Sequence, residues 1–503
     1  METYTTDDAL TIMGFGKFQG LVLAYAGMGW VAEAMEVMLL SFLGPVVREV
    51  WNVSPQDESL LSSVVFAGML IGALTWGFIS DSYGRSDSFL CLIGYMSRVN
   101  ELNLVLLFRT VLLLSTLLTS GLGFLSALSP NYSCLLILRF FVGIGVGSGH
   151  VFSSWFLEFV PAGNRGTWMI VFSFFWTIGT VLEALLAWVV LPGLSWRWLL
   201  ALSSLPCFLL LPFFRITPES PRYLCAQNRM VDARLVLERM ANANQASLPL
   251  GVLTFHGETN INYSTHASED EHLITVTEKK EHTVVNAINS KSAAIAALRK
   301  LLSHNLLRST LLLWFVCYAS SFAYYGIALL ASQLTDVNRS CSSNLIFEMD
   351  QKDGNLYKDT FITSLAEAPG LILSALLVDW FGRKATMCFL MLGCCVFLGP
   401  LVLHQNELFT TTLLFGARAC GSGGTIVVCL YAPEVYPTAI RSTGVGVATA
   451  IGKIGGVVCP LVAVGMLRSC HQMAAVLVFE LVLFLAGVAC LLFPVETKGR
   501  EMD

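Results

Sequence analysis

Two carboxylates interrupt an otherwise apolar stretch near the start of the 503-residue chain. Glu33 and Glu36 are three residues apart, so in a helix their side chains share one face. A carboxylate at membrane depth is costly unless it is protonated, paired or facing a cavity. Repulsion between the two favours a proton on one of them. The pair therefore predicts a substrate- or proton-binding site, with a structural hydrogen bond to a neighbouring helix as the alternative.

Cationic side chains also interrupt apolar runs. Lys453 lies between two glycines in such a run. It could bind the carboxylate of a substrate, or it could neutralise Glu183 or one of the two carboxylates above. Arg139 and Arg418 occupy matching places in the two halves of the chain, where we expect them near the outer ends of their helices. They could stabilise an acidic partner during proton transfer, or they could form structural ion pairs.

Several aromatic residues could complete a binding site, because aromatic faces attract quaternary ammonium groups. The candidates for lining a cavity are Tyr25, Trp30, Trp176, Tyr318, Tyr324 and Tyr325. Packing inside a helix bundle is the alternative for each of them. His150 and Glu367 are isolated polar residues for which we expect hydrogen bonds between helices.

A further set of residues occurs once in each half of the chain. The pattern Asp-x-x-Gly-Arg is found at Asp81, Gly84 and Arg85, and again at Asp379, Gly382 and Arg383. The pattern Glu-x-x-Pro-x-x-x-Arg follows each copy, at Glu158 and Arg165 and at Glu434 and Arg441. An ordered set that recurs in this way indicates an internal repeat. Charges at helix ends can form ion pairs that break when the halves move, so we predict gates here, with membrane anchoring by basic loops as the alternative.

The composition indicates which elements hold these residues. The chain is 55% hydrophobic and only 13% charged, about half the charged fraction of a soluble domain. A membrane-spanning helix needs about 20 apolar residues. The sequence therefore predicts an all-α polytopic membrane protein with two repeats of six transmembrane helices, at residues 18–43, 60–80, 106–128, 134–156, 167–190, 198–215, 308–332, 359–379, 385–403, 410–432, 444–466 and 472–494.

Lysine and arginine are more frequent on one side of this arrangement, which predicts its orientation. We expect a cytoplasmic N-terminus (1–17), two six-helix halves (18–215 and 308–494), a cytoplasmic central loop (216–307) and a cytoplasmic tail (495–503). The central loop should contain a short helix over 222–240 and a partly disordered stretch beyond it. Asn338 begins a glycosylation sequon in the expected outer loop 333–358.

The two repeats differ in length at one place. Asp81 and Arg139 are 58 residues apart, whereas the matching Asp379 and Arg418 are 39 residues apart. The first repeat therefore has 19 extra residues, in a stretch rich in polar side chains. We predict an insertion near residues 90–112 that lies on the cytoplasmic surface, outside the bundle. A splicing or gene-model artefact would leave the same pattern.

These motifs resemble those of the major facilitator superfamily, in which Asp-x-x-Gly-Arg follows the second and eighth helices. The segments 218–222 and 494–500 resemble the sugar-porter and organic-ion branch of that superfamily. The first helix, over 27–41, is similar to the synaptic-vesicle-two-related group, and within it to plant organic cation/carnitine transporters related to niacin transporters. The resemblance implies that both arginines in the membrane belong to the family's Arg-x-x-x-Gly-x-Gly signature, although the copy at Arg418 is one residue shorter before its first glycine.

The resemblance and the residues together predict a secondary transporter of a small organic ion, working by alternating access and coupled to protons. An organic cation or carnitine is the leading substrate, followed by nicotinate. A sugar/proton symporter and a non-transporting receptor or scaffold are the alternatives. The expected partners are the substrate, protons and the lipid bilayer, with no nucleic acid, metal or cofactor. We expect a monomer, in the plasma membrane rather than the vacuolar membrane.

Overall fold

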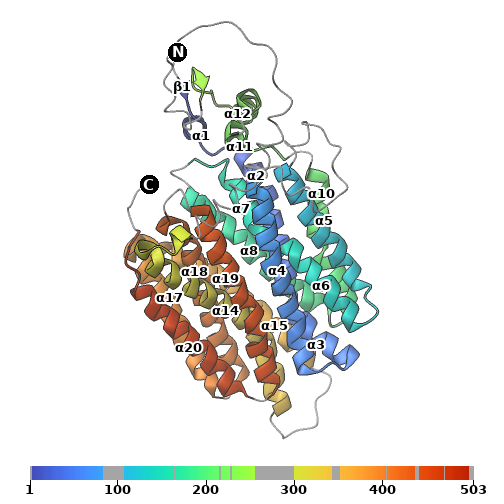
Figure 1. The fold of residues 1–503 in the computed structure, drawn as a ribbon. Coiled ribbons are helices and arrows are strands. Elements are labelled where there is room, and N and C mark those ends of the chain that lie inside the picture. The colour runs from blue at the N-terminus through green and yellow to red at the C-terminus, as the bar shows by residue number, and fades with distance from the viewer. Residues whose placement is uncertain are drawn as a thin grey trace, which may run out of the picture.

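The fold was analysed in a computed structural model, which is built almost entirely of α-helices (Figure 1). It describes residues 3–82, 107–161, 165–214, 217–226, 229–254, 299–341, 352–403, 405–436, 441–469 and 471–497. Both ends of the chain lie at one end of the helix bundle. We call this end the terminal face and the opposite end the distal face.

The first half of the bundle consists of six rods, three of which are broken into two helices. They are α2–α3 (Lys17–Met38 and Leu40–Trp51), α4 (Pro55–Ser82), α5 (Leu107–Ala127), α6–α7 (Tyr132–Val146 and Gly149–Leu157), α8 (Arg165–Val190) and α9–α10 (Trp196–Ser203 and Leu205–Phe213).

The second half repeats the pattern. Its rods are α14 (His304–Cys341), α15–α16 (Lys352–Leu365 and Glu367–Phe381), α17 (Arg383–Leu398) with the 3-10 turn η5 (Gly399–Val402), α18 (Glu407–Val435), α19 (Arg441–Pro460) with the π-helical turn η7 (Leu461–Met466), and α20 (Gln472–Leu491).

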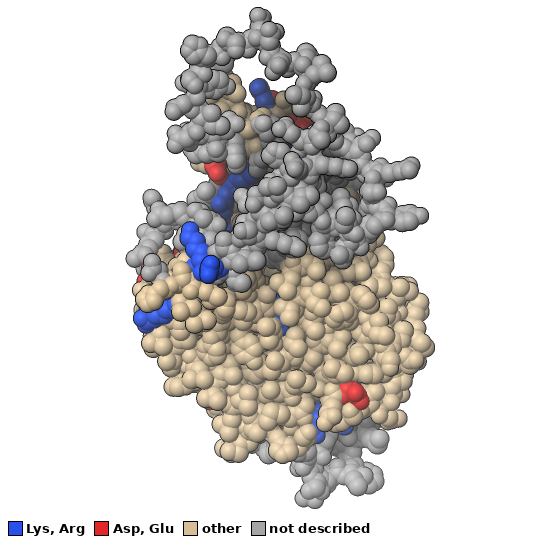
Figure 2. Space-filling model, viewed as in Figure 1, with Lys and Arg blue, Asp and Glu red and all other residues tan. Residues whose placement is uncertain are grey.

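The surface and length of these rods suit a membrane. Within the described ranges, 11 helical segments are long and apolar enough to cross a bilayer, and α5 adds the shorter apolar helix Leu112–Ala127. Figure 2 shows a broad uncharged band around the middle of the molecule, with charged side chains gathered near its ends. The expected all-α polytopic membrane fold is confirmed.

Local chemistry explains where the rods break. Pro369 has no N–H to donate to the carbonyl of Leu365, so α15 ends at Leu365 and α16 begins at Glu367. Gly147 and Ser148 separate α6 from α7 differently, since both N–H groups still donate, to the carbonyls of Gly143 at 2.9 Å and Gly145 at 3.2 Å. Both breaks place polar side chains in the interior of the bundle, where regular helices would present apolar ones.

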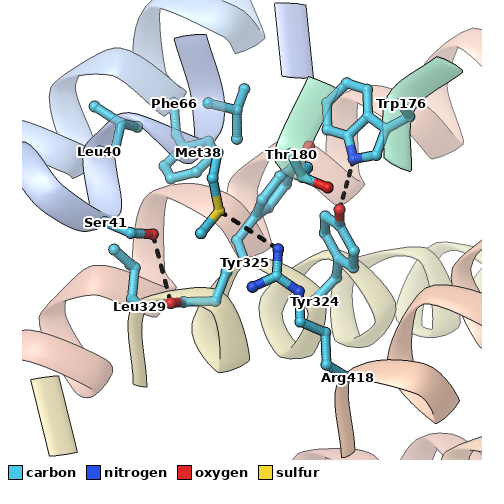
Figure 3. Close-up of a pocket in the computed structure, with 12 residues that line it drawn as sticks. Met38, Leu40, Ser41, Phe66, Trp176, Thr180, Tyr324, Tyr325, Leu329 and Arg418 are labelled. Atoms are coloured by element: carbon cyan, nitrogen blue, oxygen red, sulfur yellow. Dashed lines mark hydrogen bonds between the residues drawn. The ribbon is translucent and has the colours of Figure 1, made fainter. Parts of the chain in front are cut away.

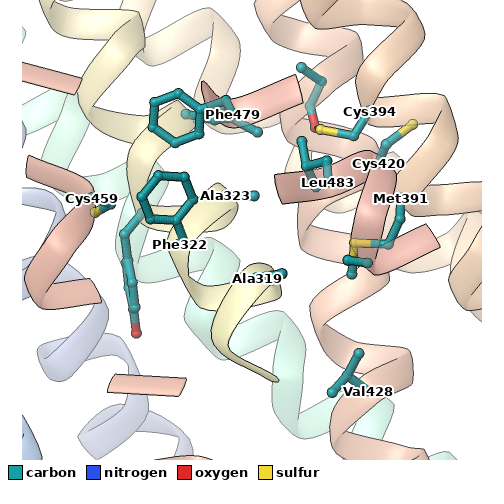
Figure 4. Close-up of a cluster of buried hydrophobic side chains, with 14 of the residues drawn as sticks. Ala319, Phe322, Ala323, Met391, Cys394, Cys420, Val428, Cys459, Phe479 and Leu483 are labelled. Atoms are coloured by element: carbon teal, nitrogen blue, oxygen red, sulfur yellow. The ribbon is translucent and has the colours of Figure 1, made fainter. Parts of the chain in front are cut away.

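The core of the second half is aromatic and sulfur-rich. The rings of Phe322 on α14 and Phe479 on α20 stack with centroids 4.6 Å apart. Met391, Cys394 and Cys420 are buried beside them (Figure 4). The two halves meet where α4 packs against α19 and α8 packs against α15. The functional candidates lie along this junction.

A small cap covers the first half at its terminal face. We call it the terminal cap; it consists of β1 (Thr3–Tyr4), α1 (Thr6–Met13), α11 (Pro221–Ala226), α12 (Met230–Asn244) and β2 (Val252–Leu253), and β1 pairs with β2 in parallel. Leu10, Leu237 and Met240 are fully buried in it. The single helix expected over 222–240 is therefore two helices, folded against the N-terminal segment.

One sequence prediction about this fold is partly wrong. α5 begins at Leu107, and Leu112 is only 1% exposed. Residues 107–112, which we expected to belong to an insertion outside the bundle, form the first turns of the third rod because Leu112 packs into the core of this half. The remainder of the expected insertion, up to residue 106, lies outside the described residues.

The expected outer loop 333–358 is also shorter than predicted. α14 continues to Cys341, and α15 begins at Lys352. The sequon at Asn338 therefore lies in the last turns of a helix rather than in a loop. Its glycosylation remains a prediction.

Candidate functional site

A cavity lies between the two halves near the middle of the bundle (Figure 3). Its lining comes from α2, α3, α4, α8, α14 and α18, and consists of Val37, Met38, Leu40, Ser41, Phe66, Trp176, Thr180, Tyr324, Tyr325, Ala328, Leu329 and Arg418. Its volume is about 20 Å³, room for one or two water molecules. The cavity is therefore nearly closed in this conformation, and a larger occupant requires the halves to separate.

A buried ion pair of the second half borders this cavity. Arg418 on α18 donates to Oε1 of Glu367 from Nε at 3.1 Å and from Nη2 at 2.9 Å. Both side chains are only 1% exposed. Buried charges are tolerated when they are paired and hydrogen-bonded in this way. Glu367, expected to form a hydrogen bond between helices, is thus the carboxylate partner of the predicted arginine.

The Glu367 carboxylate also joins the two halves. The Tyr324 hydroxyl donates to Oε1 at 2.8 Å, and the Thr180 hydroxyl donates to Oε2 at 3.1 Å. Trp176 Nε1 donates to the Tyr324 hydroxyl at 2.5 Å (Figure 3). Trp176 and Thr180 lie on α8 of the first half, whereas Tyr324, Glu367 and Arg418 belong to the second half. The network therefore forms part of the contact between the two halves.

The first half contains a corresponding pair. Arg139 Nη1 donates to Oε2 of Glu36 at 2.7 Å, and Arg139 Nη2 donates to the Ser126 hydroxyl at 2.5 Å. Both charged side chains are 1% exposed. Glu33 and Glu36 share one face of α2, as expected. Both side chains point towards the α6–α7 rod, where Arg139 and Ser148 lie.

The positions of the two arginines differ from the sequence prediction. Arg139 lies about two turns inside α6, and Arg418 lies about three turns inside α18. We expected both near the outer ends of their helices, and that placement is wrong. The helices begin earlier than hydropathy suggests, at Tyr132 and Glu407, because polar residues are accommodated in their first turns.

Glu33 is less firmly paired than Glu36. The Ser148 hydroxyl donates to Glu33 Oε1 at 3.4 Å, and the cation that acts on it electrostatically is Lys453. Lys453 Nζ donates to the Tyr325 hydroxyl at 3.2 Å and lies 5.6 Å from the centre of the Tyr325 ring. Lys453 therefore joins α19 to the cavity residue Tyr325 of α14, whereas its relation to Glu33 on α2 is one of charge without a close contact.

Glu183 is fully buried on α8 and faces α9. The Ser203 hydroxyl lies 2.8 Å and 2.9 Å from its two carboxylate oxygens. No ion pair to Glu183 is found among the described residues. Lys453 is therefore not its neutralising partner, although that was one of the alternatives in the sequence.

The predicted aromatic residues fall into two groups. Tyr325 lines the cavity, and Trp30 packs against the cavity residue Trp176 with ring centroids 5.1 Å apart. Tyr25 instead contacts Trp155 at 5.8 Å, and Tyr318 stacks on Phe322 at 6.0 Å. Neither of these two tyrosines lines the cavity in this conformation, and their contacts are those of packing, the alternative that the sequence left open.

The second copy of the repeated motif forms contacts at the terminal face. Gly382 joins α16 to α17 with a φ of 83°, a conformation that favours glycine. Arg383 Nη2 lies 3.1 Å from Glu434 Oε1. Glu496 accepts hydrogen bonds from the backbone N–H groups of Arg383 at 2.9 Å and Lys384 at 3.0 Å. Asp379 is exposed and has no ion pair among the described residues.

The first copy is only partly visible. The Asp81 side chain, Gly84, Arg85 and the Arg441 side chain lie outside the described residues.

The other two residues of the first copy are described. Glu158 lies beside Arg165, Arg222 and the Ser220 hydroxyl; burial raises the pKa of its carboxyl, which these three groups lower in part. Asp7 of the terminal cap approaches Arg222 at 2.5 Å and Arg165 at 3.8 Å.

We expect Glu496→Gln to destabilise the terminal face of the second half. The carboxylate caps the N-terminus of α17 and interacts with its dipole, contributions worth about 1 kcal/mol each. Thermal unfolding in detergent should therefore show a lower midpoint than wild type. The matched control is Glu238→Gln in the exposed Arg234–Glu238 pair on α12, which should change the midpoint little. An equal effect of both substitutions would show that the cap adds nothing.

Comparisons with known proteins agree with this geometry. A family model described as "Sugar (and other) transporter" matches residues 106–251 and 284–503. Organic cation/carnitine transporter 7 of Arabidopsis thaliana is 50% identical over 502 residues, which cover 99% of this chain and 96% of that protein. Synaptic vesicle 2-related protein of Xenopus laevis is 34% identical over 513 residues, covering 100% of this chain and 83% of that protein.

Solved structures show the same fold. The proton:xylose symporter XylE bound to 6-bromo-6-deoxy-D-glucose superimposes with a TM-score of 0.66 at 17% identity, covering 98% of both chains. The inward-open conformation of XylE from E. coli gives a TM-score of 0.61 at 15% identity, covering 96% of this chain and 98% of that one. The chain is an integral, multi-pass membrane protein that belongs to the sugar (and other) transporter family of the major facilitator superfamily.

Proposed function

We propose that this transporter carries a small organic ion with separated charges, with carnitine as the leading substrate, by proton-coupled alternating access. The observation that carries the proposal is the cavity between the halves, which Arg418 and four aromatic side chains line together. The name of the 50% identical relative, organic cation/carnitine transporter 7, supports the same substrate class.

A carboxylate end of the substrate would be held by cations. Arg418 reaches the cavity, and its Nη1 has no hydrogen-bond partner among the described residues. An arginine with a free donor recognises a carboxylate well, because its donors form a planar fork. Lys453 lies beside the cavity residue Tyr325 and offers a second positive charge.

An ammonium end would be held by aromatic faces and by a carboxylate. Trp176, Tyr324 and Tyr325 line the cavity, and such rings attract quaternary ammonium groups. Glu33 lies one turn before the cavity residue Val37 on α2. A substrate with both charges would satisfy the arginine and the aromatic cluster at once.

Glu33 is our candidate for the proton carrier. Glu36 is held by Arg139 at 2.7 Å, whereas the hydrogen bond of Glu33 to Ser148 is 3.4 Å long. A buried carboxylate without a close cation is costly when charged. Glu33 can therefore exchange a proton as the halves move and as Lys453 approaches or leaves.

Nicotinate is the second candidate substrate. It carries a carboxylate for Arg418 and a ring for the aromatic cluster, but it has no ammonium group for Glu33. A sugar would use neither charge. The sugar symporter structures superimpose at 15–17% identity, so we draw only the fold from them.

The repeated loop residues would serve as gates at the terminal face, which we place in the cytoplasm. Glu434 with Arg383, and Glu158 with Arg165 and Arg222, are the groups available for this. We place the transporter in the plasma membrane as a monomer.

Uptake into proteoliposomes tests the substrate proposal. Purified protein is reconstituted, and labelled carnitine, nicotinate and glucose are offered separately, each with and without an excess of unlabelled compound. We expect saturable uptake of carnitine above that of empty liposomes, weaker uptake of nicotinate and none of glucose. Saturable glucose uptake without carnitine uptake would favour the sugar symporter, and no uptake of any of them would favour the receptor or scaffold.

A further inference from the structure

A cluster of charged and polar residues on the distal face crosses the junction between the two halves. We propose that Glu58, Gln333 and Arg468 form a gate, here called the distal gate, which closes the central cavity on that face and opens when the site turns towards it. This inference rests on the proposed alternating-access function. It adds the residues that control access to the cavity from the distal face.

The geometry of the cluster is that of a built ion pair. Glu58 lies in the first turn of α4, and its side chain is only 1% exposed. Gln333 Nε2 donates to Glu58 Oε1 at 2.9 Å. Arg468 Nε lies 3.3 Å from Oε2, and Arg468 Nη2 donates to Oε1 at 3.4 Å. Glu58 belongs to the first half and its two partners to the second, so the cluster holds the halves together.

The surroundings of Glu58 are arranged for an anion. Arg48 of α3 places Nη1 3.7 Å from Oε2, and the N-terminus of α4 adds the positive end of its dipole. The neighbouring Asp57 carboxylate accepts a hydrogen bond from the Ser54 hydroxyl at 2.7 Å. A lone buried carboxylate would be strongly destabilising. Glu58 therefore has stabilising neighbours in its own half, whereas its contacts with Gln333 and Arg468 exist only while the distal face is closed.

Apolar contacts also join the two halves on the distal side, between α15 and the helices α3 and α8. Phe42 on α3 lies 6.1 Å from Tyr357 on α15, and Trp188 on α8 lies 5.7 Å from Phe361 on α15, as ring centroids. All four residues lie in the distal half of their rods. The ion pair itself is shielded from water, since the side chains of Arg468 and Glu58 are 5% and 1% exposed, and this strengthens their attraction while the gate is closed.

The distal gate also lies over the cavity. The Ser41 hydroxyl of α3 donates to the Ala328 carbonyl of α14 at 3.4 Å, and both residues line the cavity (Figure 3). Gln333 is little more than one turn beyond Ala328 on the same helix. Separation at the distal gate would therefore open the cavity to the distal side.

A polar gate can open at low cost. When the halves separate, water replaces the protein partners of Glu58 and Arg468, so the charges are not left buried and unpaired. A closure made only of apolar contacts would not hold the two halves in one defined position, because apolar contacts have no preferred direction. The ion pair thus gives the closed state a defined geometry and still permits repeated opening.

Accessibility of a cysteine in the cavity tests the distal gate. Ser41 is 2% exposed and lines the cavity, so we introduce Ser41→Cys and add a membrane-impermeant maleimide from the distal side of reconstituted protein. The modified peptide is quantified by mass spectrometry, which separates it from native cysteines. Adding Arg468→Glu places two carboxylates together, and we expect labelling at least about tenfold faster than in Ser41→Cys alone.

Two further variants keep the test specific. The exchange of charges, Glu58→Arg with Arg468→Glu, is made in the Arg48→Ala background, because Arg48 would repel the new arginine. Labelling should then return towards the Ser41→Cys rate, because Gln333 can also accept from an arginine. Arg48→Ala is the control: its side chain is 37% exposed and its pair is longer, so labelling should change by no more than about twofold. Glu58→Gln, which retains the size of the side chain, serves if the reversed charges prevent folding.

The proposal is overturned if correctly folded Arg468→Glu is labelled at the control rate, or if the exchanged pair is labelled as fast as the single variant. Folding is judged by elution as a single species in size-exclusion chromatography. Labelling requires no substrate, so the result is independent of whether carnitine is transported. Normal carnitine uptake together with unchanged labelling would contradict the distal gate but leave the proposed function intact.

Discussion

Replacing Arg418 with leucine should abolish carnitine transport and markedly destabilise the protein. The substitution leaves the Glu367 carboxylate buried with hydroxyl partners only, and breaking a buried ion pair from one side costs about 3–5 kcal/mol. The loss of a donor that lines the cavity should in addition lower uptake by about a hundredfold or more. Initial uptake rates and thermal unfolding in detergent measure the two effects.

The double variant Arg418→Leu with Glu367→Leu separates stability from transport. Removing both charges leaves no uncompensated group, so thermal stability should recover towards wild type. Transport should not recover, because the substrate carboxylate has lost its arginine. Recovery of both would mean that the pair is structural, which is the alternative that the sequence left open for this arginine.

Replacing Glu33 with glutamine should uncouple transport from protons. An amide cannot take up or release a proton, while its size and its hydrogen bond with Ser148 can be retained. We expect carnitine to equilibrate across the membrane without accumulating when a pH gradient is imposed. Measured as the ratio of internal to external carnitine, the result should be near one at any gradient.

Glu36→Gln is the matched control for this experiment. Glu36 is the partner of Arg139 at 2.7 Å, so its loss leaves a buried arginine unpaired and should lower stability. The protein that remains folded should still accumulate carnitine. Retained coupling in Glu33→Gln together with lost coupling in Glu36→Gln would exchange the roles that we assign to them.

The sequence predicted the charged residues of the site better than their partners. Arg139, Arg418 and Lys453 were evident because each interrupts an apolar run. Glu367, although visible as a single polar residue in such a run, lies 51 residues from Arg418. Their pairing depends on how α16 and α18 rotate about their axes, and no local pattern in the sequence encodes that rotation.

The distal gate was not predicted, for a similar reason. Glu58 follows a serine, a proline and an aspartate at the start of α4, and acidic residues are common in the first turn of any helix. Arg468 is one more charge just beyond the expected helix 444–466. The two residues lie 410 positions apart, and only the packing of the two halves brings them together.

The packing of the terminal cap could not be predicted from the composition of its segments. Its helix α12 was anticipated, but its packing against α1 was not. Residues such as Leu10 and Leu237 are few and widely separated in the sequence, so their shared core is recognisable only once the chain is folded.

The steady accumulation of labelled carnitine at a fixed pH gradient tests the central claim most directly. Wild-type protein is reconstituted into liposomes that are more alkaline inside, with the membrane potential clamped. A gradient of one pH unit supplies about 1.4 kcal/mol per proton, which corresponds to about tenfold accumulation for one proton per carnitine. We predict accumulation that increases with the gradient and disappears when a protonophore is added. Saturable uptake that never exceeds the external concentration would contradict proton coupling, and the absence of carnitine uptake would contradict the proposed substrate.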